Sequence, residues 1–319
     1  MSAPAPVAVL AGGVGAARLL AGLVQVVDEA SITAVVNTGD DTELHGLCIS
    51  PDLDTVTYTL AGAANPETGW GLAGETWAAM EALARFGDGA WFRLGDRDLA
   101  THLHRTGRRR AGATLSEVTA EITRAWGLRL RLLPMSDDPV RTRVRLADGP
   151  EVEFQEYFVR LRHAVAVAGV RFEGIEDAAP APGVVEALEQ AAVVLLAPSN
   201  PVVSLGPILG LGPVAAALGA RRASVVAVSP IVAGAALKGP ADRLLLELGE
   251  EASAVGVARR LAPYVGTLVV DEADAGLAAA VEAVGVRCVV TDTIMRSPDV
   301  AAELCRTALA AGGRVPGDR

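Results

Sequence analysis

Three observations predict a doubly wound α/β fold around a mainly parallel sheet. Short runs of β-branched and other apolar residues alternate with helix-like segments toward both ends of the 319-residue chain. These runs are apolar on both faces, which is typical of strands covered by helices on each side of a parallel sheet. A glycine-rich turn follows the first run and leads into a helical pattern, as expected of a strand–loop–helix unit.

The expected elements follow one another along the chain. The first strand is Pro6–Leu10, and a helix covers roughly residues 16–27. The second strand is Ile32–Asn37. After the middle of the chain, four further strands are each followed by a candidate helix: Val193–Pro198, Val225–Pro230, Thr267–Asp271 and Cys288–Thr291. Together these strands predict the parallel sheet.

The middle of the chain breaks this alternation. Leu72–Phe86 and Thr114–Trp126 are predicted helices, and a capping box of Thr114 with Glu117 opens the second. Val140–Arg145 and Glu151–Phe158 alternate in polarity on either side of a turn, which predicts a hairpin.

This break suggests two parts. Residues 1–64 and 166–319 are expected to form a nucleotide-binding core. Residues 65–165 are expected to be inserted between them as a helical and hairpin subdomain. We expect this insertion to pack over one edge of the sheet and to act as a substrate-binding lid.

Composition narrows the class of partner. Lys and Arg number 28 against 38 Asp and Glu, which leaves a net charge of −10 and argues against a nucleic-acid-binding surface. The three distant cysteines argue against a disulfide framework or a zinc ribbon. No leader peptide opens the chain, and no apolar stretch is long enough to span a bilayer. We therefore expect a cytoplasmic protein that acts on small molecules.

The loop after the first strand carries Gly12, Gly13 and Gly15. Glycines let a backbone approach a phosphate, and the following helix offers unpaired amides and the positive end of its dipole. The loop is not a P-loop, and Arg18 stands where a dinucleotide fold would have its third glycine. We predict contact with a phosphate or nucleotide; a tight turn without a ligand is the alternative.

Acidic residues follow the second strand. Asn37 begins a loop that contains Asp40, and Asp52 and Asp54 come shortly afterwards. Carboxylates are the natural ligands of Mg²⁺. We expect Asp40 and Asp54 to hold Mg²⁺ and to act in catalysis, with Asp54 also orienting a nucleophilic hydroxyl. Asp52 is as well explained as the cap of a helix that begins near Leu53.

A basic and acidic segment lies within the insertion. Arg93 and Arg97 are candidate clamps for phosphate or carboxylate, because the guanidinium fork matches such groups. His102 and His104 are two residues apart and diverge on a helix. We expect both histidines to lie on the surface.

The second half of the sheet offers further polar groups. Ser199 and Asn200 follow a strand in a proline-fixed turn that suits an uncharged contact to a nucleotide. Lys238 is the only lysine of the chain and lies in the loop after another strand. It is a candidate point charge beside a diphosphate, although an exposed loop lysine explains it equally well.

Taken in order, several of these segments resemble the 2-phospho-L-lactate transferase family of deazaflavin coenzyme (F-420) biosynthesis, including its actinobacterial phosphoenolpyruvate-transferase branch. Each motif alone is weak, but the ordered set is specific and extends from about Val7 to Ala311. The segments are Gly12–Gly15, Asn37–Asp41, Ser50–Val56, Leu94–His102, Leu133–Asp138, Pro198–Pro201 and Val228–Ile231.

The resemblance implies a Rossmann-like, Mg²⁺-dependent and often dimeric enzyme. Such an enzyme moves a phosphoenolpyruvyl or 2-phospho-L-lactyl group from a guanosine-diphosphate-activated donor to the terminal hydroxyl of the deazaflavin riboside Fo and releases GMP. The identities of Val14 and of Gly39 with Asp40 lean toward the actinobacterial branch and the enolpyruvyl donor.

The resemblance also implies roles for individual residues. Asp54 and Arg93 match residues that contact Fo, and Asp40 and Asp54 match the metal-binding acids. The segments Gly12–Gly15 and Ser199–Pro201 match nucleotide contacts. We expect three tryptophans of the insertion to be candidate stacking walls for the ring of Fo, although core packing explains Trp77 better: Trp70, Trp77 and Trp91.

Two other functions compete with transfer. Two features oppose an NAD(P)-dependent dehydrogenase. The third glycine of the dinucleotide loop is missing, and two adjacent acids, Asp40 and Asp41, follow the second strand where such an enzyme would have one. A non-catalytic nucleotide-binding regulator, like the gluconeogenesis-factor relatives, is opposed by Pro51–Asp54 and Arg93–Asp98, which resemble the deazaflavin-handling segments of the transferases.

Overall fold

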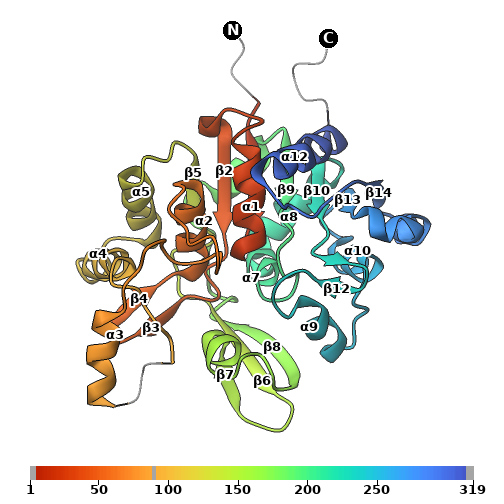
Figure 1. Ribbon diagram of the computed structural model, residues 1–319. Helices are drawn as coiled ribbons and strands as arrows, with labels where there is room; N and C mark the ends of the chain where they lie inside the picture. The colour runs from red at the N-terminus through yellow and green to blue at the C-terminus, as the bar shows by residue number, and fades with distance from the viewer. Residues whose placement is uncertain (1–4, 88–90, 314–319) are drawn as a thin grey trace.

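A seven-stranded, entirely parallel sheet forms the centre of the computed structural model, which describes residues 5–87 and 91–313 (Figure 1). The strand order β14-β13-β10-β9-β1-β2-β5 confirms the predicted doubly wound, Rossmann-like α/β fold. The strands are β1 (Val7–Ala11), β2 (Ile32–Val36), β5 (Arg131–Pro134), β9 (Val193–Leu196), β10 (Val225–Val228), β13 (Thr267–Val270) and β14 (Arg287–Val290).

Helices cover both faces of this sheet. The helices are α1 (Gly13–Leu23), α2 (Pro51–Leu60), α3 (Ala78–Leu83), α4 (Asp98–Arg110), α5 (Leu115–Ala125), α6 (Val184–Gln190), α7 (Leu205–Gly210), α8 (Gly212–Ala220), α9 (Ala241–Glu247), α10 (Ala254–Leu261), α11 (Ala278–Ala283) and α12 (Pro298–Gly312). Within the described residues, no helix is long and apolar enough to cross a membrane.

Alternate residues of β1 serve two different cores. Val7 and Val9 pack in a cluster with apolar residues of α1 and α12. Ala8 and Leu10 belong to the cluster on the opposite face, which includes residues of α7, α8 and α10. Because successive side chains of a strand point to opposite faces, a strand buried on both sides must be apolar throughout. This explains the continuous apolar runs in the sequence.

Helices α1 and α12 approach closely at Gly22. A Cβ atom at this position would lie against the backbone of Ala301 and Ala302, which cannot move as a flexible side chain would. We therefore expect Gly22→Ala to lower the free energy of unfolding by about 1–3 kcal/mol. Chemical denaturation measures this change.

Gly107 provides the matched control, because it lies inside α4 and a Cβ there meets nothing within 4 Å. Gly107→Ala should stabilise the protein by roughly 0.5–1 kcal/mol, through the greater helix propensity of alanine. Equal effects at the two glycines would contradict the close α1–α12 contact.

The predicted capping box is confirmed at the start of α5. Thr114 Oγ1 accepts a hydrogen bond from the Glu117 backbone N–H at 3.2 Å. Glu117 Oε2 in turn accepts one from the Thr114 N–H at 2.8 Å. The two side chains thus satisfy donors that the helix itself leaves free.

The segment expected as an insertion takes part in the central sheet. Its strand β5 lies at the sheet edge and pairs with β2. A separate three-stranded sheet, β7-β6-β8, extends from the lower end of the molecule in Figure 1. It contains β6 (Arg141–Leu146), β7 (Glu151–Glu153) and β8 (Val167–Glu173). The pairs β2–β5 and β6–β8 therefore cross both expected boundaries of the 65–165 segment. Residues 1–4, 88–90 and 314–319, which belong to the two expected parts, lie outside the described chain.

Two predicted elements of this region are shorter than expected. The helix expected at Leu72–Phe86 begins only at Ala78, because Gly71 and Gly74 adopt positive φ angles and hold the preceding chain in turns. The strand expected at Glu151–Phe158 ends at Glu153 and continues as a π-helical turn. Phe154 and Phe158 stack with centroids 5.4 Å apart, so their spacing of four serves a helical turn rather than a strand.

Two short hairpins complete the fold. Strands β3 (Thr42–Leu44) and β4 (Leu47–Ile49) form one of them, with His45 and Gly46 at positive φ in the turn. The other consists of β11 (Ile231–Val232) and β12 (Ala235–Ala236). The first leads directly into α2, and the second leads toward Lys238 and α9.

Candidate active site

A cavity of about 320 Å³ opens where the loops after β1 and β9 meet. β1 and β9 are neighbours in the sheet. The strand order continues from β1 to β2 and β5 on one side, and from β9 to β10, β13 and β14 on the other. Open α/β sheets bind ligands beyond the carboxyl ends of strands at such a switch point. Most of the predicted site residues line the cavity, with Asn37 and Arg97 as exceptions: Gly12, Gly13, Gly15, Asp40, Asp54, Arg93, Ser199, Asn200 and Lys238.

The glycine loop is bound to the loop after β9. Ser199 Oγ donates to the carbonyl of Gly12 at 2.8 Å and accepts from its N–H at 3.2 Å. A Cβ on Gly15 would come within 2.5 Å of the Pro198 carbonyl oxygen, and Gly13 has a φ of +71°. The glycines thus permit the two loops to meet, in addition to any approach of a ligand to the backbone. Asn200 Oδ1 caps its own turn by accepting from Val202.

Asn37 joins two buried acids. Its Nδ2 donates to Asp40 Oδ2 at 3.1 Å and to Asp52 Oδ2 at 3.0 Å. Asp40 Oδ1 is buried and has no hydrogen-bond partner among the described residues. The predicted role of Asn37 in binding is therefore indirect in this structure, because its side chain organises the acids instead of lining the cavity.

Burial shifts the pKa of these acids upward. Burial raises the pKa of Asp40 well above its usual range, and the charge of Asp52 raises it further. Burial also raises the pKa of Asp52 to about 6 and that of the neighbouring Asp41 to about 7. In the described part of the chain, the ion pairs at this cavity are made by Asp54 and Asp98, not by Asp40 or Asp52. Two carboxylates that lie close together and face no cationic side chain are suited to bind a divalent ion.

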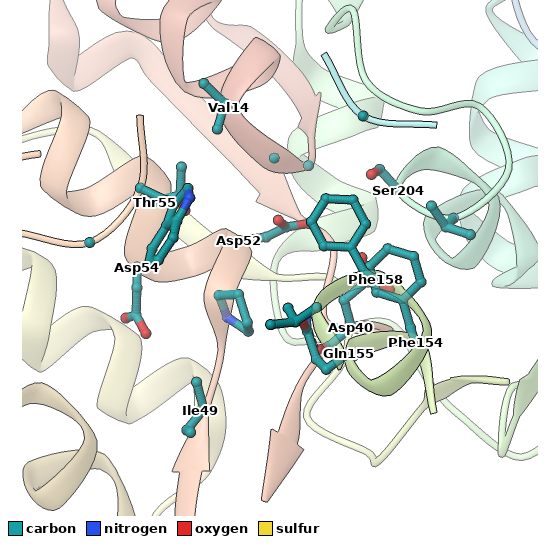
Figure 2. A pocket seen from close by; sticks show the side chains of 18 of the residues that line it. Val14, Asp40, Ile49, Asp52, Asp54, Thr55, Phe154, Gln155, Phe158 and Ser204 are labelled. Atoms are coloured by element: carbon teal, nitrogen blue, oxygen red, sulfur yellow. Dashed lines mark hydrogen bonds between the residues drawn. The ribbon is translucent and has the colours of Figure 1, made fainter. Parts of the chain in front are cut away.

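Asp54 belongs to a different group of side chains. Arg105 donates to both of its oxygens, through Nη1 to Oδ2 at 3.1 Å and through Nη2 to Oδ1. The carboxylates of Asp52 and Asp54, both on α2, point in different directions (Figure 2). We expected Asp40 and Asp54 to share one cation. In the structure Asp40 instead lies beside Asp52, and Asp54 forms an ion pair with Arg105.

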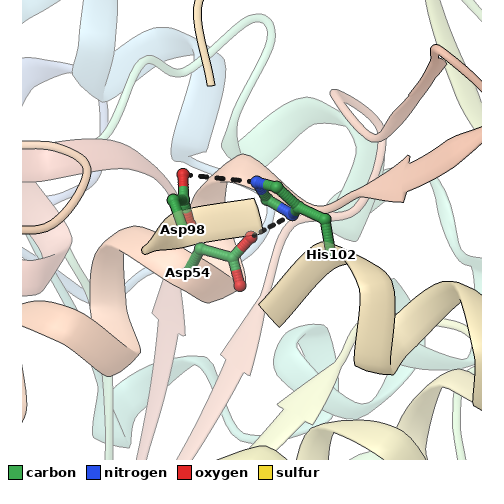
Figure 3. A group of neighbouring side chains, drawn as sticks. All are labelled: Asp54, Asp98 and His102. Carbon is green, nitrogen blue, oxygen red and sulfur yellow. Dashed lines mark ion pairs between the residues drawn. The ribbon is translucent and has the colours of Figure 1, made fainter. Parts of the chain in front are cut away.

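His102 lies in the wall of the cavity, and the expectation that it lies on the surface is wrong. It is 1% exposed, with Nε2 3.2 Å from Asp98 Oδ2 and Nδ1 3.8 Å from Asp54 Oδ2 (Figure 3). Burial opposes ionisation of Asp98, but the nearby His102 outweighs this effect, so the pKa of Asp98 is lowered. His104 faces solvent and contacts Glu121, as expected.

Arg93 lies at the cavity with an aromatic partner. Its guanidinium carbon is 4.5 Å from the centroid of the Trp77 ring, a cation–π contact. Arg97, the other predicted clamp, donates instead to the Ala73 carbonyl at 2.6 Å and does not line the cavity. Of the three tryptophans considered as stacking walls, only Trp70 lines the cavity. Trp91 packs edge-on against Phe92.

Lys238 reaches across the rim of the cavity. Its Nζ donates to the Thr68 carbonyl at 2.5 Å and thereby ties the loop that carries Trp70 to the loop before α9. Burial lowers the pKa of Lys238, and the charge of Arg18 lowers it further. The cationic side chains of Lys238 and Arg18 thus lie near the start of α1, where the helix dipole also favours an anion.

Sequence reasoning missed the cavity wall formed by the turn after β7. Phe154, Gln155 and Phe158 line the cavity there. Gln155 Nε2 donates to the backbone carbonyl of Asp40 at 3.0 Å, which fixes this turn against the acidic loop. The spacing of four between the two phenylalanines was the available signal for a helical turn with one aromatic face.

The buried acids predict that the metal-free protein loses stability as the pH rises. Because folding raises the pKa of Asp52 from 3.8 to about 6, the folded chain binds more protons than the unfolded chain between these values. The stabilisation is complete below 3.8 and is lost as the pH rises through about 6, or about 7 for Asp41. For Asp52 alone we expect a loss on the order of 2–3 kcal/mol.

Thermal unfolding in a chelating buffer, from about pH 4 to about pH 7.5, measures this loss. Asp52→Asn provides the matched control, since it removes one titrating group and should make the pH dependence shallower, while Asp40 and Asp41 still titrate. Parallel curves for the two proteins would contradict the assignment of the stability loss to this acid.

Comparison with known proteins agrees with the ordered motifs. The chain matches the family model described as 2-phospho-L-lactate transferase CofD over residues 7–306. It is 47% identical to a phosphoenolpyruvate transferase from Kitasatospora aureofaciens, over 96% of this chain and 97% of that protein. A phosphoenolpyruvate transferase from Mycolicibacterium smegmatis is 42% identical, over 96% of this chain and 98% of that protein.

A solved structure shares the fold. A member of the UPF0052 family from Bacillus halodurans superposes with a TM-score of 0.60 at 16% identity, over 96% of this chain and 99% of that chain. At this identity the likeness concerns the arrangement of the sheet and its helices.

Proposed function

The chain belongs to the CofD family of 2-phospho-L-lactate transferases, and on that premise we propose the reaction that it catalyses. It moves a phosphoenolpyruvyl or 2-phospho-L-lactyl group from a guanosine-diphosphate-activated donor to the terminal hydroxyl of the deazaflavin riboside Fo, and it releases GMP. The relatives named phosphoenolpyruvate transferase, at 42–47% identity, favour the enolpyruvyl donor. We also propose a cytoplasmic homodimer; light scattering would test the dimer.

The observation that carries this proposal is that one cavity gathers groups for both substrates. The glycine loop, Lys238, the acids Asp40 and Asp52, and Arg93 all line it, and Asn37 joins the two acids. A Cβ on Gly12 would come within 3.1 Å of Asp52 Oδ2, so the acids and the anion-binding loop are adjacent. This arrangement suits a diphosphate donor that meets an uncharged, ring-bearing acceptor.

Asp40 and Asp52 are the residues that would hold Mg²⁺. They fit it because both are buried, both have raised pKa values and Asp40 Oδ1 has no partner among the described residues. Bound there, the ion would neutralise charge on the donor diphosphate. Asp54 remains a candidate ligand by the family resemblance, but it would first have to leave Arg105.

The chain's own residues have distinct tasks in the transfer. The amides of Gly13 and Gly15, in the first turn of α1, would bind donor phosphate oxygens, with Ser199 holding the backbone of Gly12 in place. Asp54 would accept a hydrogen bond from the terminal hydroxyl of Fo, whose oxygen forms the new bond to phosphorus as the bond to GMP breaks. Arg93, steadied by Trp77, would contact Fo.

Incubation of the purified protein with Fo, Mg²⁺ and each guanylylated donor tests the proposal by mass spectrometry. We expect a phosphodiester product and GMP, formed faster from the enolpyruvyl donor. Binding of the guanine nucleotide without product would favour a non-catalytic regulator. An Mg²⁺-independent change in nicotinamide absorbance would favour a dehydrogenase.

A further inference from the structure

One face of α4 carries three polar side chains into the interior beside Asp54. Asp98, His102 and Arg105 follow one another at spacings of four and three, so they lie on the same side of the helix. His102 is 1% exposed and Arg105 is 2% exposed. The donor and cation sites described above use none of these three side chains.

Their contacts form a circuit that begins and ends on α2. Arg105 donates to both oxygens of Asp54, and its Nη1 also lies 3.3 Å from His102 Nδ1. His102 Nε2 lies 3.2 Å from Asp98 Oδ2. Asp98 Oδ1 accepts a hydrogen bond from the hydroxyl of Tyr58 at 2.5 Å, and Tyr58 is one helical turn after Asp54 on α2.

The same group could be mistaken for a metal site. Single ligand atoms of Asp54, Asp98 and His102 lie within 4.8 Å of one another (Figure 3). However, a cation bound there would have to displace the guanidinium of Arg105 from Asp54 and would face its positive charge. The cluster therefore suits the orientation of a carboxylate better than the binding of a cation.

The circuit presents one carboxylate to the cavity in a fixed plane. Asp54, Tyr58, Asp98 and His102 line the cavity, whereas Arg105 lies behind them. A buried ion pair contributes little net stability, because desolvation offsets the attraction. A bidentate guanidinium does, however, fix both the position and the plane of its carboxylate. The distinctive contribution of this pair is thus geometric.

We propose that His102 and Arg105 are positioning residues, which hold the Asp54 carboxylate in the orientation that accepts the hydrogen bond of the acceptor's reacting hydroxyl. This inference rests on the function proposed above. Asp98, held in turn by Tyr58, keeps the His102 ring in place. A displacement of about 1 Å at a reacting group can lower the rate by about 100-fold.

Steady-state kinetics with each substrate varied in turn tests the proposal. His102→Leu removes both polar contacts of the ring, and we expect kcat/KM for Fo to fall by about 100-fold, with the KM for the guanylylated donor unchanged. His102→Gln restores a donor toward Asp98 and should recover much of the loss. His104→Leu, on the exposed face of the same helix, should behave as the unaltered protein.

A folded His102→Leu protein with unaltered kcat/KM for Fo, or with a KM for the guanylylated donor that rises as much as the KM for Fo, would overturn the proposal. If His102→Leu does not fold, Tyr58→Phe gives the second test. It keeps the ring packed against Trp126, with centroids 5.5 Å apart, and removes the hydroxyl from Asp98. We expect a smaller fall in kcat/KM for Fo, again with the KM for the guanylylated donor unchanged, and an unaltered kcat/KM for Fo would overturn the proposal.

Product formation by the unaltered protein separates this inference from the proposed function. If that protein makes no product, the proposed function fails, and Fo binding followed by the fluorescence of the deazaflavin ring still compares the variants. Weaker binding to His102→Leu than to His104→Leu then supports the positioning role. Equal binding overturns it.

Discussion

Asp40→Asn is expected to lower Mg²⁺-supported transfer by about 10³-fold, the scale on which single charge-stabilising groups act in phosphoryl transfer. The same change should make the metal-free protein more stable. Asp40 is buried beside Asp52, and both effects raise the pKa of Asp40, so its charge is unfavourable unless a cation faces it. An asparagine removes that repulsion together with the ligand.

Initial rates at increasing Mg²⁺ concentrations, together with thermal unfolding in a chelating buffer, measure the two effects. Asp41→Asn is the matched control, because the carboxylate of Asp41 accepts from Ser50 Oγ at 2.7 Å and does not line the cavity. It should retain transfer. Near-normal turnover of Asp40→Asn at saturating Mg²⁺ would show that this acid does not hold the ion.

The strands of the sheet were predictable because burial on both faces leaves a continuous apolar run. The six strands predicted for the central sheet all lie in it. The seventh, β5, escaped prediction because it is a four-residue edge strand whose Arg131 is exposed. A short run with a charged end has no distinctive pattern, and only its pairing with β2 identifies it.

The loops of the site were predictable for a topological reason, since the carboxyl ends of parallel strands meet at one edge. The grouping of the acids was not. Asp52 and Asp54 are two residues apart on α2 and therefore point about 200° apart around the helix, so only one can face Asp40. The sequence does not say which one, because that depends on how α2 is rotated against β1 and β2.

The sequence predicts the role of α4 only in part. Asp98, His102 and Arg105 have the spacing of one helix face, which is visible in the sequence. Charged residues on one face normally indicate the solvent side, yet here Leu103 is 60% exposed and the charged face is buried. The buried partner that reverses this rule is Asp54, more than 40 residues away.

Asp54→Asn is expected to slow transfer strongly and also to destabilise the fold. The acceptor's hydroxyl loses the carboxylate that orients it, and we expect a loss of about 10²-fold or more in kcat. Arg105 would be left as a buried charge with one weak partner in place of a bidentate one. Breaking a buried pair from one side in this way costs about 3–5 kcal/mol of unfolding free energy.

Asp54→Asn combined with Arg105→Met separates the two losses. The second change removes the unpaired buried charge of Arg105, so denaturation should show that much of the unfolding free energy is regained. Transfer should remain impaired, because the methionine restores packing but not the carboxylate charge that orients the hydroxyl. If the double variant recovered activity along with stability, the effect of Asp54→Asn on transfer would come from misfolding alone. Near-normal turnover of Asp54→Asn itself would leave this acid without a role in the reaction, and the pair with Arg105 would then be structural.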